Sequence, residues 1–159
     1  MLSVTKFRLL GAALAIGVAS MSAASLAQDK ETVLKDRQAT MKEQGKSLGA
    51  VKAYIDGKGD LAQAKTGAAN LTQTTKKIPQ LFPAGTGGPS PDGDYVAKPE
   101  IWTDWNKFLE AQKAAAAKAD ALLVAVNGGD KNAIEAAFND LGKNGCGGCH
   151  TTFREKIEK

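Results

Sequence analysis

Two cysteines and the only histidine of the chain lie within five residues near its C-terminal end. The sequence there reads Cys146-Gly147-Gly148-Cys149-His150. Two thiols separated by two residues can each add to one vinyl group of a haem, and the adjacent imidazole can then bind the iron. The small glycines allow a flat macrocycle to approach the backbone closely. The pattern predicts one haem c per chain, attached covalently through Cys146 and Cys149, with His150 as the proximal iron ligand.

Three other chemistries compete for the same residues. A Cys146–Cys149 disulfide is compatible with an oxidising compartment. A thioredoxin-like dithiol requires a βαβ context, which the sequence does not show. A zinc site of the usual four-ligand kind needs more than one histidine and two cysteines. Neither a disulfide nor a dithiol requires a histidine directly after the second cysteine, so the pattern favours haem.

The first 27 residues have the parts of an export signal. Lys6 and Arg8 make a positive start, and residues 9–21 form an uncharged apolar run. Small residues lead to Ala27, after which we expect cleavage. A membrane anchor is the alternative, but the run is shorter than the roughly 20 residues that span a bilayer. We expect a signal peptide over 1–27 and a periplasmic domain over 28–159.

Beyond the signal peptide, the sequence has helical spacing and almost no strand signal. Apolar residues recur every three, four or seven positions, which places them on one helix face. Glycines and prolines separate four such segments, at about 28–55, 61–78, 99–126 and 131–157, with a long crossover loop over 82–97. Asp60 and Asp130 are the expected N-caps of the second and fourth segments. The pattern predicts an all-α fold, an antiparallel four-helix bundle. The expected core positions are Leu34, Met41, Leu48, Val51, Ile55, Leu61, Ala64, Ala68, Leu71, Thr75, Ile78, Trp102, Trp105, Leu109, Ala116, Ala119, Leu123, Val126, Ile134, Phe138, Leu141, Phe153 and Ile157.

Charge and composition exclude other classes of function. The chain holds 21 Lys and Arg against 17 Asp and Glu, a formal net charge of +4. Without Lys6 and Arg8, residues 28–159 carry 19 minus 17, or +2. That charge is small for a nucleic-acid binder, and the basic residues are interspersed with acidic ones. We therefore expect no nucleic-acid partner. No second apolar run approaches transmembrane length, so we also expect no stable membrane insertion.

Several landmarks, in their order and spacing, resemble a known family. They are Arg37-Gln38-Ala39-Thr40-Met41-Lys42, Leu81-Phe82-Pro83, Lys98-Pro99-Glu100-Ile101-Trp102 and the run from Cys146 to Phe153-Arg154. Residues 28–159 resemble the class II c-type cytochromes, the cytochrome c′ family, over essentially their whole length. The resemblance implies a four-helix bundle with haem attached near the C-terminus.

The resemblance also implies two alternatives for the sixth coordination position of the iron. In one branch of the family, a methionine of the first helix is the distal ligand, the haem is low-spin and the protein carries single electrons. In the other, the iron is five-coordinate and high-spin and binds nitric oxide or other small gases. The run from Met41 to Gly45 resembles the first branch. We expect Met41 to bind the iron, with Gly45 leaving space for the ring; the alternative for Met41 is a flexible core filler.

Further expectations concern Arg37, Arg154 and the partners. Arg37 lies one turn before Met41 and either contacts a haem propionate or is a solvated surface arginine. Arg154 matches a basic position of the family motif, or is a cation at a helix C-terminus. An electron carrier needs no catalytic group and none is found, so we do not expect an enzyme. The expected partners are transient redox proteins and, from the resemblance, a second copy bound through the first two helices.

Overall fold

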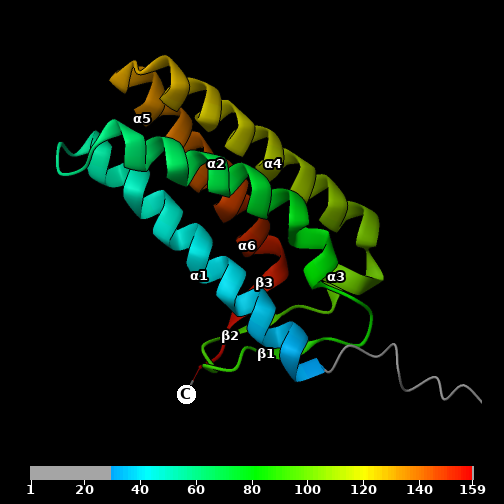
Figure 1. Ribbon diagram of the computed structural model, residues 1–159. Coiled ribbons are helices and arrows are strands. Elements are labelled where there is room, and N and C mark those ends of the chain that lie inside the picture. Colours follow the sequence, from blue (N-terminus) through cyan, green and yellow to red (C-terminus); the bar gives the residue numbers. More distant parts are fainter. Residues whose placement is uncertain (1–29, 159) are drawn as a thin grey trace, which may run out of the picture.

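The computed structural model describes residues 30–158, in which four long helical segments run side by side (Figure 1). They are α1 (Lys30–Ile55), α2 (Leu61–Lys77), α4 (Trp105–Gly128) and a fourth segment made of α5 (Lys131–Asp140), η3 (Leu141–Gly147) and α6 (Gly148–Phe153). Helix α2 packs against both α1 and α4, and the fourth segment packs on α4. The expected four-helix bundle is confirmed. The predicted signal peptide lies outside the described residues.

Two helix starts follow directly from the local sequence. Asp60 precedes α2, and its carboxylate accepts a hydrogen bond from the backbone N of Gln63 at 2.7 Å. Asp130 precedes α5 and accepts a hydrogen bond from the backbone N of Asn132 at 2.9 Å. The first N–H groups of a helix have no partner within it, and these carboxylates satisfy them. Both predicted N-caps are confirmed.

The third helical segment is interrupted near its start. A short helix, α3 (Glu100–Thr103), follows Pro99, and Asp104 then leaves helical geometry with φ −131° and ψ 62°. The Asp104 carboxylate accepts a hydrogen bond from the backbone N of Lys107 at 3.2 Å, so it caps α4 as a new helix. The expectation of one unbroken helix from Pro99 is therefore wrong. An aspartate side chain competes for backbone N–H groups and favours such a restart.

A short 3-10 helix, η2 (Ile78–Leu81), directly follows α2, and two strands of a small antiparallel sheet replace part of the loop predicted over 82–97. Strand β1 (Gly88–Pro89) pairs with β2 (Tyr95–Ala97), and β2 pairs in turn with β3 (Arg154–Lys156). Because β3 follows α6 directly, the fourth helical segment ends at Phe153, and the prediction that it reaches Ile157 is wrong.

The hydrophobic core is divided into two clusters. The first gathers small and aliphatic residues from α1, α2, α4, α5 and the start of η3, whereas the second is mainly aromatic and lies where η2, α3, α4 and α6 meet. The buried members of the first are Val51, Ile55, Ala64, Ala68, Leu71, Ala119, Leu122, Val126, Ile134 and Leu141, and those of the second are Ile78, Phe82, Ile101, Phe108 and Phe153.

The buried face of α1 differs from the predicted one. Leu34, Met41 and Leu48 are half-buried. The residues of α1 that are buried are Val33, Arg37, Gln44, Ser47, Val51 and Ile55. Leu34 and Met41 line a cavity, and Met41 also packs against the second core cluster. The heptad spacing therefore identified the helix correctly but misplaced the buried face over its first half.

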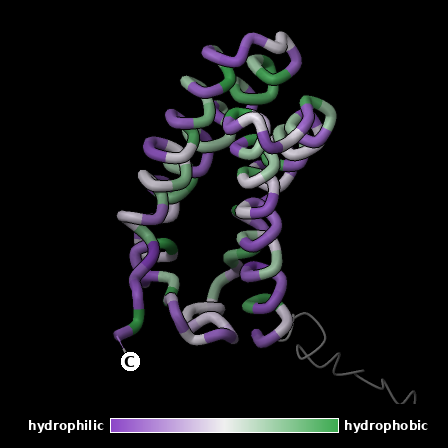
Figure 2. The backbone as a smooth tube through the Cα atoms, turned by 90° about the vertical axis from the view of Figure 1, so that its left-hand side faces the viewer, coloured by the Kyte–Doolittle hydropathy of each residue, from purple (hydrophilic) through white to green (hydrophobic). Residues whose placement is uncertain are grey.

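A side view shows that the start of α1 and the C-terminal segment lie on opposite sides of the molecule (Figure 2). In Figure 2, α1 begins beside the grey trace, and the C-terminal segment descends on the opposite side, with the β1–β2 hairpin region across the bottom. Hydrophilic and hydrophobic stretches alternate along each helix, as amphipathic helices require. Within residues 30–158, no helix combines the length and the apolar content needed to cross a bilayer.

Candidate cofactor site

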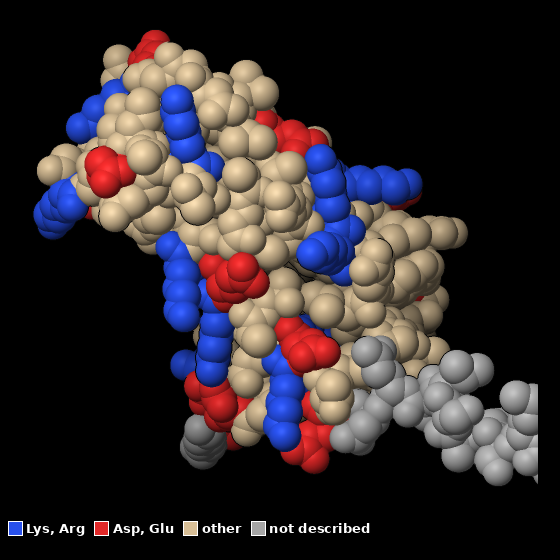
Figure 3. All heavy atoms as spheres, in the orientation of Figure 1, with Lys and Arg blue, Asp and Glu red and all other residues tan. Residues whose placement is uncertain are grey.

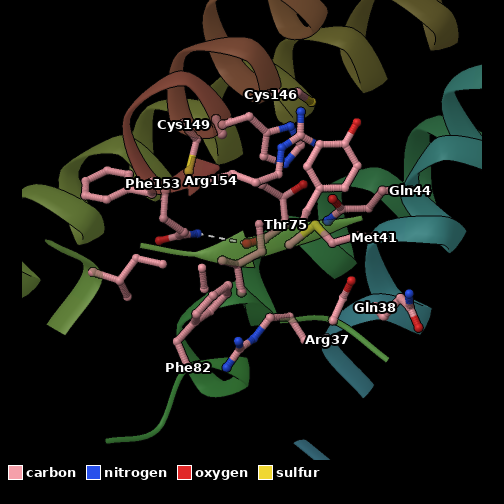
Figure 4. A pocket seen from close by; sticks show the side chains of 18 of the residues that line it. Arg37, Gln38, Met41, Gln44, Thr75, Phe82, Cys146, Cys149, Phe153 and Arg154 are labelled. Atoms are coloured by element: carbon pink, nitrogen blue, oxygen red, sulfur yellow. Dashed lines mark hydrogen bonds between the residues drawn. The ribbon is translucent and has the colours of Figure 1, made fainter. Parts of the chain in front are cut away.

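A cavity of about 360 Å³ lies between the two core clusters. Cys146, Cys149 and His150 line it from the C-terminal segment, and Met41 lines it from α1. Figure 4 shows the Cys146 and Cys149 side chains together on one side of the cavity and Met41 reaching in from another element. The structure therefore brings together the four residues that the sequence predicted as haem attachment points and iron ligands.

The cysteines lie at a change in helix type. Segment η3, which carries Cys146, is π-helical, and the α-helix α6 begins at Gly148. A Cβ atom added at Gly145 would lie 2.9 Å from Leu141 Cδ1 and 3.5 Å from Ala115 Cα, so the π-helical turn packs closely on α4. Short π-helical stretches are frequent at functional sites because the widened turn changes which residues face one side.

Burial controls the charge of the motif residues. It raises the pKa of the Cys146 thiol, and together with the nearby Cys146 it raises the pKa of Cys149 to about 11. Burial, with the positive charge of Arg154, lowers the pKa of His150 to about 4. Both thiols are free rather than joined in a disulfide. The imidazole is therefore neutral at physiological pH, which is the form that binds metal ions.

The wall opposite the motif contains Met41 but not the expected glycine. Gln44 is buried and lines the cavity beside Met41, and its Nε2 donates a hydrogen bond to Thr74 Oγ1 at 3.3 Å. Gly45 is exposed, does not line the cavity, and has open space where a Cβ would stand. The expectation that Gly45 makes room for the ring is wrong, because Gln44, three residues after Met41, forms the cavity wall at that level and Gly45 is left at the surface.

Arg37 lies in the same wall and is buried, so its interpretation as a solvated surface residue is wrong. Its side chain is 8% exposed. The guanidinium Nη2 donates a hydrogen bond to Thr86 Oγ1 at 2.8 Å, and Nε donates to the backbone carbonyl of Leu81 at 3.0 Å. Burial lowers its pKa to about 10. Contact between Arg37 and a haem propionate stays a prediction.

The β1–β2 hairpin forms a further wall, which sequence reasoning missed. Asp92 and Tyr95 line the cavity from the hairpin. Lys42 of α1 forms an ion pair with Asp92 at 2.5 Å, and the Arg154 guanidinium lies 4.2 Å from the centroid of the Tyr95 ring. Arg154 is the C-terminal capping residue of α6, as expected for a cation at a helix C-terminus, and its side chain stacks on the Tyr95 ring. The dipeptide Asp92-Gly93 was the available signal, since it is typical of tight hairpin turns.

The residues present fit a haem. Two thiols, an imidazole and a thioether line one cavity, whose volume falls in the range of roughly 300–1,000 Å³ that is usual for small-molecule and cofactor sites. Phe82, Phe108 and Phe153 also line it and suit a flat apolar ring.

Comparison with known proteins is consistent with this site. A family model described as cytochrome C′ matches residues 32–154. A cytochrome c-556 from Rhodopseudomonas palustris is 32% identical over 141 residues, covering 84% of this chain and 89% of that protein. The nitric oxide complex of a leucine-to-alanine mutant of cytochrome c prime from Alcaligenes xylosoxidans superposes with a TM-score of 0.70 at 31% identity, covering 80% of this chain and 97% of that one. A cytochrome c′ described as having an unusual ligand-controlled dimer dissociation gives a TM-score of 0.73 at 25% identity, over 80% and 97% of the two chains.

Proposed function

Because this chain belongs to the cytochrome c′ family, whose members bind covalently attached haem c, we propose that it is an exported single-electron carrier with a low-spin haem ligated by His150 and Met41. The observation that carries the proposal is the presence of both side chains in the wall of one cavity. Met41 is half-buried and unbranched, so its thioether can turn towards the iron. The proposal assigns no catalytic residue and no enzymatic turnover.

The cysteines, His150 and Met41 each have a separate role towards the haem. When bound, the haem supplies an iron that gains and loses one electron. Cys146 and Cys149 would hold the macrocycle to the C-terminal segment, and the neutral His150 would supply an imidazole nitrogen to the iron. The soft Met41 thioether favours ferrous over ferric iron and therefore raises the reduction potential. Helix α1 packs on α2, α2 packs on α4, and α4 packs on η3 and α6. The bundle thereby connects the helix that carries Met41 to the segment that carries His150, which would keep the ligand positions similar in both oxidation states.

A second candidate function is the binding of nitric oxide or another small gas by a five-coordinate, high-spin haem. The comparisons favour it more than methionine ligation, because a similar solved structure is a nitric oxide complex. In this candidate, Met41 stays in the cavity wall without binding iron. We place it second because the proteins compared share only about a third of their residues with this chain, whereas Met41 is a donor in the chain itself.

Electron paramagnetic resonance of the oxidised holoprotein separates the two candidates. Ligation by Met41 predicts a low-spin signal, and Met41→Ala should convert it to high-spin and allow rapid carbon monoxide binding in the reduced state. Leu34→Ala is the matched control, because Leu34 also lines the cavity from α1 but has no donor atom. A dominant high-spin signal in the unsubstituted protein would establish the second candidate instead.

We also propose that residues 1–27 are a signal peptide and that the protein works in the periplasm. The expected intact mass of the exported protein is that of residues 28–159 plus one haem. Replacing both Cys146 and Cys149 with alanine should abolish the haem increment and leave the polypeptide mass otherwise explained by the substitutions. A retained N-terminal segment would contradict cleavage, whereas a missing haem increment in the unsubstituted protein would contradict attachment.

We further propose two kinds of protein contact. Transient redox partners are expected to dock by shape and weak charge interactions, because Lys and Arg side chains alternate with Asp and Glu over the face seen in Figure 3. A homodimer is supported by the solved structure whose description mentions dimer dissociation. Its expected interface is the shallow groove between α1 and α2, which Lys46, Thr66 and Ala69 help to line.

A further inference from the structure

Arg37 joins α1 to the segment that follows α2. Besides the bonds from Nε to the Leu81 carbonyl and from Nη2 to Thr86 Oγ1, both Nη1 and Nη2 donate to the Thr86 carbonyl at 3.2 Å. The guanidinium group has five N–H donors in a fixed fork, and four hydrogen bonds therefore occupy most of its capacity. The Thr86 hydroxyl in turn donates to the carbonyl of Pro83 at 2.7 Å, which fixes the acceptor.

The same guanidinium lies against the aromatic cluster. Its Cζ is 4.0 Å from the centroid of the Phe82 ring and 5.9 Å from that of Trp102. The Phe82 ring contacts Phe108 with centroids 5.0 Å apart, and Phe108 contacts Phe153 with centroids 5.4 Å apart, both edge to face. Phe153 belongs to α6, the helix that carries Cys149 and His150. A continuous line of side-chain contacts therefore runs from Arg37 of α1 to Phe153 of α6.

We infer that Arg37 is a positioning residue, which sets the distance between α1, with its Met41, and helix α6. It does this through its contacts with Thr86 and Phe82. Met41 lies one helical turn after Arg37, so a shift of the Arg37 turn carries Met41 with it. The inference rests on the proposed ligation of iron by Met41. It replaces the predicted propionate contact as the main role of Arg37.

The residues around Arg37 satisfy its guanidinium group without a haem propionate. A buried cation is costly unless its donors are satisfied, and the Leu81 carbonyl, the Thr86 carbonyl and the Thr86 hydroxyl provide acceptors. Aromatic faces add an attraction for the cation. Figure 4 shows Arg37 beside Phe82, on the side of the cavity away from the two cysteines. A propionate contact would require only the charge, whereas this arrangement uses the fork geometry that lysine lacks.

The test compares Arg37→Lys, Arg37→Gln and Thr86→Val in the holoprotein. Thr86→Val removes an acceptor of Arg37 without removing the Arg37 charge. Thr103→Val is the matched control, since Thr103 is an exposed threonine with a single long hydrogen bond to the Pro99 carbonyl at 3.4 Å. The readouts are the ratio of high-spin to low-spin haem by electron paramagnetic resonance, and the midpoint potential as a function of pH.

We expect Thr86→Val and Arg37→Lys to raise the ratio of high-spin to low-spin haem by about tenfold, the size of effect expected when one hydrogen bond to a charged group is lost. Thr103→Val should leave the ratio unchanged. The inference is overturned if Thr86→Val and Arg37→Lys both match the unsubstituted protein while Arg37→Gln alone shifts the potential, because that is the pattern of a propionate partner.

Failure of the proposed function gives a different result. If the unsubstituted protein is already high-spin, Met41 ligation is wrong, and the same variants are compared by the rate of carbon monoxide binding to the reduced haem. A changed rate in both Thr86→Val and Arg37→Lys then supports positioning of α1 by Arg37. Rates equal to that of the unsubstituted protein in both variants overturn it.

Discussion

Burial has opposite effects on the acidic and basic side chains around the cavity, because it always disfavours the charged form. It raises the pKa of the thiols of Cys146 and Cys149 and lowers the pKa of His150 and Arg37. The motif residues are therefore neutral, which suits thioether bonds and an imidazole ligand. Arg37 stays protonated at neutral pH, since its pKa of about 10 is still well above 7.

Asp140 provides a pH-dependent contribution at the start of η3. Hydrogen bonds from Lys118 and Asn144 lower the pKa of its carboxyl below the ordinary 3.8. The ionised form is thus favoured in the folded state, so its stabilisation is present above about pH 4 and is lost as the pH falls through the folded-state pKa. Asp140→Asn should lower stability at neutral pH, and should lose less stability than the unsubstituted protein between about pH 5 and about pH 3. Urea denaturation at both pH values measures this, and equal acid losses would contradict it.

At the scale of elements, helices α1 and α2 approach closely because α2 has a glycine at their contact. A Cβ atom added at Gly67 would lie 2.7 Å from the Ser47 carbonyl oxygen and 3.4 Å from Ala50 Cβ. The Ser47 oxygen belongs to the backbone and cannot rotate away, so the two helices would have to move apart. The contact matters for the site because α1 carries Met41.

Gly67→Ala should therefore destabilise the protein by about 1–3 kcal/mol, the usual cost of overpacking. Gly45→Ala is the matched control on α1: a Cβ there meets nothing within 4 Å, so the substitution should stabilise by about 0.5–1 kcal/mol through helix propensity. Denaturation midpoints of the two variants measure the difference. Stabilisation by Gly67→Ala would show that the helices separate without cost.

Sequence spacing predicted the helices better than the segments that connect them. The four helical segments and the caps at Asp60 and Asp130 depend on residues a few positions apart, which a sequence reports directly. The break at Asp104 was missed because Pro99 already gave a sufficient helix start nearby. The sheet was missed because its strands are two or three residues long and its third strand comes from the C-terminal end.

At the scale of the whole molecule, the cavity borders both core clusters and is enclosed by segments far apart in the chain. Residues from α1, α2, the hairpin, α4 and the C-terminal segment all line it. A prosthetic group placed there would contact both clusters at once. We therefore expect the haem, which stays attached when the chain unfolds, to contribute to folding stability by burying its apolar ring against both clusters.

The homodimer is tested through the groove between α1 and α2. Thr66 is exposed and lines this groove, so Thr66→Arg should place a bulky charge in the interface and reduce dimer content severalfold or more. Ala136→Arg, at an exposed position on α5, is the control and should leave dimer content unchanged. Sedimentation velocity of the holoproteins at matched concentrations measures both. A purely monomeric unsubstituted protein would contradict the homodimer.

The sequence by itself determined the attachment chemistry and the helices. Cys146, Cys149 and His150 are neighbours in the chain, so their spacing carries the chemistry whatever the rest of the fold does. Tertiary structure alone decided which residues share the cavity with them: it placed Met41 there, turned Gly45 away, buried Arg37 against Phe82 and closed one side with the β1–β2 hairpin. These outcomes depend on helix rotation and on contacts between segments far apart in the chain, and spacing along one helix does not report either.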